Sequence, residues 1–242
     1  MKKISQLFLM LFVALVIVAT SCKKPEAEDP PPQQDPLPEI DYDQGLGSNP
    51  GYPVGYQYNL PEHVHIIGDI RAGTEGRATE IDKETYKGPF PACEMNRNWT
   101  TYGTGTYVNL YMLLYNSQNA PTTVSFPGGL IFCDTQDNSH EPQFQRGLVL
   151  QTVNIPIGAY DTAWVHLPCY CLNMHLGVPG FNTVYYIGPI STNPQLNQLV
   201  LLMAPKQYPL GHEGSLQTIV WNITDNGQTL TQSEIQFINS LP

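Results

Sequence analysis

Four residues that can bind a metal ion fall within the ten positions 166–175: His166, Cys169, Cys171 and His175. Thiolate sulfur and imidazole nitrogen together suit zinc or copper(I). The spacing matches no zinc-finger pattern, however, and in an extended strand His166 and Cys169 would point to opposite faces. They are therefore weak metal ligands, and we expect neither a metal nor any other cofactor.

The remaining cysteines of the folded part are Cys93 and Cys133. The chain carries an export signal, described below, and exported proteins can form disulfides. Four cysteines allow three sets of pairs. Cys169 and Cys171 share one face of a strand, but a bridge between them would strain the backbone. The predicted disulfide is therefore Cys93–Cys133.

Two segments combine a thiol with a side-chain amide. Residues 170–172 read Tyr-Cys-Leu in a predicted strand, and residues 216–221 read Leu-Gln-Thr-Ile-Val-Trp in a predicted helix. They resemble the two halves of the bacterial thioester domain of surface adhesins, an aromatic-Cys-aliphatic motif and an apolar-Gln-x-x-apolar-apolar motif. The resemblance implies that the Cys171 thiol displaces ammonia from the Gln217 side chain and leaves an internal thioester. A lysine of a partner would then open it to form a covalent bond.

A structural interpretation of the same two segments stays open. Cys171 would be a buried strand residue, because free cysteine behaves as a small apolar side chain. Gln217 would be a polar residue on an amphipathic helix that places Trp221 in the core. The two interpretations differ in whether the thiol and the amide react.

An enzyme is the least favoured interpretation. It would need a pocket that gathers His166, His175 or His212 with a carboxylate such as Glu213. The sequence contains no recognisable nucleophile and base at a helpful spacing, so we do not expect an enzyme. Separately, residues 161–163 (Asp-Thr-Ala) resemble the O-glycosylation sequon of secreted Bacteroidetes proteins, which implies that Thr162 accepts a glycan.

The N-terminus has the features of an export signal. Lys2 and Lys3 precede an apolar run over residues 7–19, which is too short for a comfortable transmembrane helix. Residues 18–22 (Val-Ala-Thr-Ser-Cys) resemble a bacterial lipobox. The resemblance implies a signal peptide over residues 1–21 and an acylated Cys22 that anchors the chain in lipid, because several acyl chains together hold stably.

Residues 22–54 are predicted to be a lipidated tether. They are rich in proline and acidic residues and hold too little apolar surface for a core, so an extended polyproline conformation is expected. The acidic cluster after Cys22 is similar to the surface-export signals of Bacteroidetes lipoproteins. This implies an outer-membrane anchor, with surface exposure favoured over a periplasmic location.

Composition limits the partners. The formal net charge is −10, and removal of Lys2 and Lys3 with the signal would make it more negative, so binding to nucleic acid through phosphate neutralisation is excluded. Tyrosine is the commonest aromatic, with 14 residues against 8 Phe and 3 Trp, and a Tyr-rich segment over residues 52–58 suits contact with a glycan or protein. The expected partners are membrane lipid through Cys22 and a host or envelope protein or glycan.

The predicted fold is mainly β, an immunoglobulin-like β-sandwich over residues 55–190 followed by a helical segment over 191–242. Short apolar runs separated by turn residues predict strands. These cover residues 64–70, 107–115, 122–126, 130–133, 147–155 and 162–172.

Three short helices are predicted after residue 190. Asn193 and Pro194 begin the first, because proline suits the first helical position. A second covers residues 215–223, and Thr231 with Glu234 forms a capping box for a third. The favoured function at this point is a non-catalytic, lipid-anchored binding or structural module, and the alternatives are a covalent thioester adhesin or a metal-binding or hydrolytic envelope protein.

Overall fold

Six strands of the protein close into a barrel. The structure, a computed structural model, describes residues 40–73, 99–135, 143–180 and 183–242. Each neighbouring pair in the ring β2, β4, β9, β7, β6 and β10 is antiparallel, and β10 closes the ring by pairing with both β6 and β2. The bounds are β2 (Val64–Ala72), β4 (Val108–Asn116), β6 (Leu130–Asp134), β7 (Gly147–Leu148), β9 (Thr162–Cys171) and β10 (Val184–Ser191).

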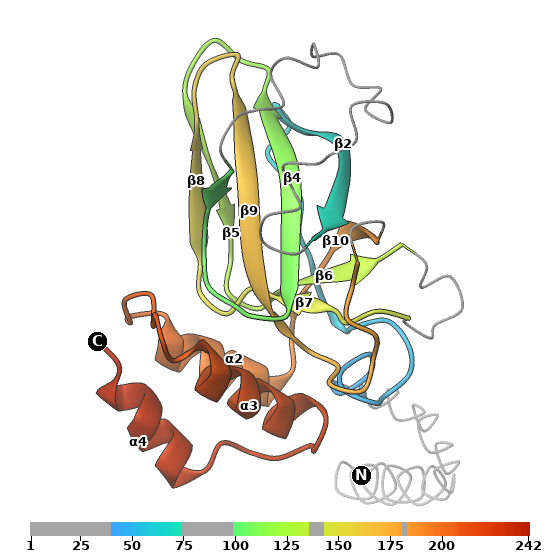
Figure 1. Cartoon of the computed structure of the whole chain (residues 1–242), viewed down its shortest axis with the longest axis vertical. Coiled ribbons are helices and arrows are strands. Elements are labelled where there is room, and N and C mark those ends of the chain that lie inside the picture. The colour runs from blue at the N-terminus through green and yellow to red at the C-terminus, as the bar shows by residue number, and fades with distance from the viewer. Residues whose placement is uncertain (1–39, 74–98, 136–142, 181–182) are drawn as a thin grey trace, which may run out of the picture. The chain divides into compact units, whose positions relative to one another are not determined.

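The other described strands add to this ring. β1 (Gly55–Gln57) extends the sheet beside β10, and β3 (Thr100–Thr101) runs parallel to β9. β5 (Thr122–Phe126) and β8 (Val153–Ile157) form a separate two-stranded antiparallel sheet. Their apolar side chains join the core of the barrel, and Figure 1 shows them beside the long strands β4 and β9.

Strand β9 divides its side chains between two apolar clusters. Leu167, Cys169 and Cys171 belong to the cluster inside the barrel. Tyr170 and Leu172 belong to a second cluster, which the three helices cover. This division follows from the two-residue period of a strand, in which alternate side chains point to opposite faces. The end of β9 is therefore buried on both faces.

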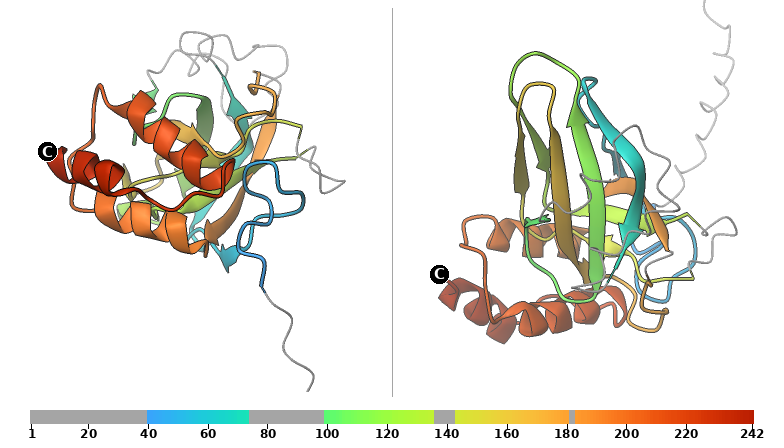
Figure 2. Two further views of the ribbon diagram at one scale, coloured as in Figure 1. Left: turned by 90° about the horizontal axis from the view of Figure 1, so that it is seen from below. Right: turned by 45° about the horizontal axis from the view of Figure 1, so that its top comes forward.

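The helices are α2 (Pro194–Met203), α3 (Glu213–Thr224) and α4 (Gln232–Ser240). Asn193 caps α2 by accepting hydrogen bonds from the N–H groups of Gln195 and Leu196, and Thr231 and Glu234 form the predicted capping box of α4. The helices lie at one end of β4 and β9 in both Figure 1 and Figure 2. No helix within the described ranges is long and apolar enough to cross a membrane.

The predicted β-rich fold with three C-terminal helices is confirmed. An immunoglobulin-like sandwich is not shown, because β10 pairs on both sides and joins the sheet into a ring. The predicted strand over residues 147–155 is broken into β7 and β8, which pair with different neighbours. Strand β10 was not predicted from the sequence.

The segment 40–54 is part of the folded unit, although the sequence predicts a tether that extends to residue 54. Leu46 is 2 % exposed and belongs to the cluster beneath the helices. The buried guanidinium of Arg146 donates hydrogen bonds to the carbonyl oxygens of Gly45 and of Gly51, the latter at 2.9 Å. These contacts bring the segment to the end of β9.

Candidate functional site

Cys171 and Gln217 are in direct contact. The Oε1 atom of Gln217 accepts the backbone N–H of Cys171 at 2.8 Å, and its Nε2 donates to the carbonyl oxygen of Cys171, also at 2.8 Å. Both residues are buried, with 0 % of Cys171 and 1 % of Gln217 exposed. The structure thus brings together the two residues that the resemblance to the thioester domain pairs.

The position of Gln217 follows from the local sequence. Leu216, Ile219, Val220 and Ile223 recur at helical spacing and form the buried face of α3. Gln217 belongs to that face, so its amide needs hydrogen-bond partners away from water. The pairing of β4 with β9 ends at Val108 and Cys169, and the Gln217 amide bonds to the backbone of β9 just beyond that point.

The Cys171 thiol is held in a largely apolar place. Its Sγ accepts the backbone N–H of Asn173 at 3.3 Å. Burial raises the pKa of the Cys171 thiol from 9.0 to about 11, while the Trp221 indole and the Asn173 N–H lower it and the Asp225 carboxylate raises it slightly. The sulfur is therefore a neutral thiol at neutral pH.

Trp221, on α3, packs against Tyr107, the residue that precedes β4. Trp221 is on α3, one helical turn after Gln217, and packs against the core of the barrel. Its ring centroid is 5.1 Å from that of Tyr107, which is 42 % exposed. Within the described part of the chain, the buried Nε1 of Trp221 has no hydrogen-bond partner.

The chain that follows Cys171 is fixed by polar contacts. The Asn173 side chain accepts the backbone N–H of Arg146 at 3.3 Å and donates to the carbonyl oxygen of Gly47 at 2.7 Å. The Asp225 carboxylate accepts the Met174 N–H at 3.0 Å and contacts the Nδ1 of His175 at 3.2 Å. The backbone that carries the thiol is thereby held on both sides.

This arrangement suits acyl transfer to sulfur. In such a reaction the Gln217 amide carbon would be the electrophile, and the Cys171 N–H is already bonded to the oxygen on which negative charge would develop. Hydrogen bonds placed on such an oxygen are a common way to stabilise a tetrahedral intermediate. Burial would protect the resulting thioester from water. The same two hydrogen bonds also suit a structural role, in which Gln217 only pairs with the backbone N–H and carbonyl groups of Cys171.

The metal candidates are not gathered. His166 contacts the Oγ1 of Thr101 and the Oδ1 of Asn109, each at 3.0 Å. Cys169 points into the barrel, whereas His175 contacts Asp225 near the helices. Among the residues described, no group of three or more His, Cys, Asp or Glu is placed to hold a metal.

The histidines and carboxylate considered for catalysis also have different surroundings. The ring of His212 packs on Phe237 at 5.8 Å, and Glu213 accepts the backbone N–H of Gly211 at 2.8 Å. His166 instead contacts residues of β3 and β4, and His175 contacts the residue that follows α3. The structure does not assemble these groups into one pocket within the described ranges.

The predicted disulfide lies partly outside the described residues. Cys133 is buried on β6 and belongs to the cluster beneath the helices, whereas Cys93 falls in the undescribed segment 74–98. Cys169 and Cys171 carry free thiols. The lipidation candidate, Cys22, is also outside the described residues.

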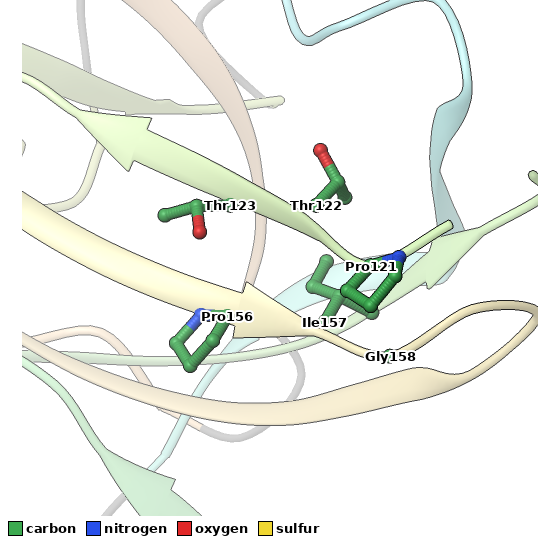
Figure 3. Close-up of a pocket in the computed structure, with 6 residues that line it drawn as sticks. All are labelled: Pro121, Thr122, Thr123, Pro156, Ile157 and Gly158. Atoms are coloured by element: carbon green, nitrogen blue, oxygen red, sulfur yellow. The ribbon is translucent and has the colours of Figure 1, made fainter.

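Thr162 begins β9 at the end of that strand away from Cys171, and it is partly exposed. Its backbone N–H donates to the Oδ1 of Asp161 at 2.7 Å. An open depression of about 530 Å³ lies close by on β5 and β8, and Figure 3 shows the six residues that line it, among them Pro121 and Pro156. Its lining contains no titratable side chain.

A second groove, of about 560 Å³, is lined by β1, by chain segments on either side of it and by residues 187–189 of β10. Tyr52, Pro53, Tyr58 and Pro189 are among its lining residues. The ring of Tyr52 stacks on that of Tyr186 with centroids 6.2 Å apart. The Tyr-rich segment predicted as a contact surface therefore lines a groove, one whose lining residues carry no charge.

Sequence reasoning missed part of the Cys171 site. It placed Trp221 in the core without relating it to the thiol, although the four-residue spacing from Gln217 puts the two side chains on one helix face. It did not identify Asn173, Arg146 or the segment 40–54. No local pattern could have done so, because these contacts join distant parts of the chain.

Comparisons with protein-family models, with curated proteins and with solved structures find no match to this chain.

Proposed function

We propose that this chain is a lipid-anchored envelope protein that attaches covalently to a partner through an internal thioester between Cys171 and Gln217. The observation that supports it is the contact between these two buried residues. The Gln217 amide forms two hydrogen bonds of 2.8 Å with the backbone of Cys171, one through its oxygen and one through its nitrogen. The two motifs are 46 residues apart in sequence, so their meeting is a property of the fold.

The chemistry needs two steps. First, Sγ of Cys171 attacks Cδ of Gln217, the C–N bond breaks, and ammonia leaves with the thiol proton. The product is a thioester enclosed by the barrel and α3. Second, an amine of the partner attacks the same carbon, the C–S bond breaks, and the amine proton returns to Cys171 as a thiol. The partner ends in an amide bond to residue 217.

The rest of the sequence is consistent with such a role. The lipobox-like segment ending at Cys22 would anchor the chain, and residues 23–39 would separate the folded part from the lipid. The acidic charge of the chain favours approach of a partner that carries lysines, because opposite charges raise the rate of encounter. The proposal therefore includes a basic partner surface and excludes nucleic acid.

The test is the intact mass of the purified protein with and without methylamine. The thioester predicts a chain lighter by one ammonia that gains one methylamine on treatment. Cys171→Ala and Gln217→Ala should each abolish both changes. Cys169→Ala is the matched control, because its thiol is two residues away on the same strand face and should leave both changes intact.

A second candidate function is a non-covalent binding or structural module. It is favoured by the state of Gln217, whose amide oxygen and nitrogen are both already hydrogen-bonded to Cys171. The same mass measurement separates the two. A wild-type chain with its full sequence mass, unchanged by methylamine, would make Gln217 a structural residue and support the non-covalent module.

A further inference from the structure

We propose that the indole N–H of Trp221 is the hydrogen-bond donor that stabilises the Cys171 sulfur while the thioester forms and opens, an inference that rests on the proposed function. Negative charge develops on the sulfur both as it loses its proton and attacks in the first step and as it leaves in the second. A donor aimed at that sulfur would accelerate both steps.

The first observation is an unused donor. Among the described residues, the buried Nε1 of Trp221 has no partner at full hydrogen-bond geometry, although the indole acts as a hydrogen-bond donor that lowers the pKa of the Cys171 thiol. Tryptophan N–H groups usually find a partner when they are buried, because an unpaired buried donor is costly. The Trp221 N–H is therefore available to a Cys171 sulfur that gains negative charge.

The second observation is the position of that donor. Trp221 follows Gln217 by four residues on α3, so both side chains leave the same face of the helix. Gln217 reaches the backbone of Cys171, and Trp221 packs against the apolar cluster that contains Cys171. The indole also lowers the pKa of the Cys171 thiol, which supports the closeness of the two groups.

The sulfur already accepts one hydrogen bond. The backbone N–H of Asn173 donates to Sγ at 3.3 Å. An indole N–H would add a second donor, which lowers the free-energy cost of negative charge on a sulfur in a site that is otherwise apolar. The Tyr107 ring, 5.1 Å from the Trp221 ring, limits where the indole can turn.

The role in each step can be written atom by atom. When the thioester forms, the thiol loses its proton as Sγ attacks Cδ of Gln217, and the indole N–H steadies the charge on sulfur. When an amine opens the thioester, the electron pair of the breaking C–S bond stays on Sγ, which accepts the N–H until the amine proton reaches it. The indole keeps its own proton throughout.

The test uses the full chain with Trp221 replaced by Phe, and in a second protein by benzothienylalanine, which keeps the bicyclic shape but lacks the N–H. Opening of the thioester by methylamine is followed by mass. We expect both replacements to slow it about 10- to 100-fold, which is the usual weight of one hydrogen bond to a charged group. Trp164→Phe is the control, since Trp164 packs on Trp99 at 5.2 Å in another part of β9.

A second measurement tests the role of Trp221 even if the variants fail to form the thioester. In a Gln217→Ala background, the pH dependence of Cys171 alkylation, read on the peptide that carries it, gives the pKa of the thiol. Removal of the indole N–H should raise that pKa by about one unit or more. A smaller side chain that only loosened the packing would make Cys171 more accessible to the alkylating reagent. It would not shift the pH dependence of alkylation to higher pH.

The outcomes are distinct from those of the proposed function. If the wild-type chain is lighter by one ammonia but benzothienylalanine changes neither the opening rate nor the alkylation profile, the role of Trp221 is wrong and the thioester stands. If the wild-type chain keeps its ammonia, the thioester is wrong, and the alkylation profile still decides whether Trp221 donates to the thiol.

Discussion

The backbone N–H of Gly47 donates a hydrogen bond to the carbonyl oxygen of Leu172 at 3.0 Å, which joins the segment 40–54 to the residue after Cys171. Gly47 has φ +56°, and a Cβ placed on it would lie 1.9 Å from the carbonyl oxygen of Thr224. Thr224 ends α3, the helix that carries Gln217. One glycine thus lies where the N-terminal segment, β9 and α3 meet.

Gly47→Ala should lower the free energy of unfolding by more than about 2 kcal/mol, because the left-handed backbone and the contact with Thr224 both oppose a methyl group. Urea unfolding measures the change. Gly214→Ala is the control: a methyl group added there would meet nothing within 4 Å, and the residue is inside α3, so the change should be neutral or stabilising. Equal effects of the two substitutions would contradict the prediction.

Arg146→Met should destabilise the protein by about 2–4 kcal/mol, because the carbonyl oxygens of Gly45 and Gly51 lose a charged donor in a buried place. Limited proteolysis should then cut within residues 40–54 sooner than in the wild type. Arg71→Ala is the comparison, since its ion pair with Asp69 is exposed and should contribute less than about 1 kcal/mol. Unchanged cleavage in Arg146→Met would show that the segment is held by other contacts.

Gln217→Ala should cost about 2–4 kcal/mol in addition to abolishing any thioester, because the backbone N–H and carbonyl of Cys171 both lose the side-chain amide that pairs with them in a buried site. The measurement is urea unfolding of the variant against wild type that has been opened with methylamine. Gln236→Ala, at an exposed position of α4, should change the stability by less than about 0.5 kcal/mol. A Gln217 variant as stable as the Gln236 variant would remove the structural basis of the site.

The opened protein, with a free thiol, should lose stability at alkaline pH. Burial raises the pKa of Cys171 from 9.0 to about 11 and that of Tyr170 from 10.0 to about 12. A group whose pKa is higher in the folded state stabilises the fold below its unfolded pKa and loses that contribution as the pH rises through the folded value. The loss should therefore run from about pH 9 to about pH 12.

The loss is read from urea unfolding at a series of pH values above about 8. Cys171→Ala should lose less stability between about pH 9 and 11, and the remainder should come from groups such as Tyr170, whose pKa is also raised by burial. In wild type with an intact thioester, Cys171 has no proton to lose. The intact form should thus behave like the Cys171→Ala variant, and identical pH profiles for intact and opened protein would count against the thioester.

The sequence by itself determined the features that depend on neighbouring residues. The helices α2 and α4 begin where Asn193 and Thr231 predicted, because a cap is formed within three residues of the chain. Strands such as β5 were predicted with their observed bounds, because alternation and turn residues are local signals. The short motifs around Cys171 and Gln217 also lie within the strand and the helix predicted for them.

The tertiary structure decided the features that join distant residues. Closure of the barrel depends on β10 pairing with β6 and β2, and no local pattern specifies the partner of a strand. The same holds for the inclusion of residues 40–54, whose polar groups are satisfied by Arg146 and Asn173 about a hundred residues away. Local sequence sets the helix or strand propensity and the hydrophobic period. Buried backbone groups outside helices and strands find their hydrogen-bond partners only when the whole chain has folded. That is why the Gln217 amide meets the backbone of Cys171.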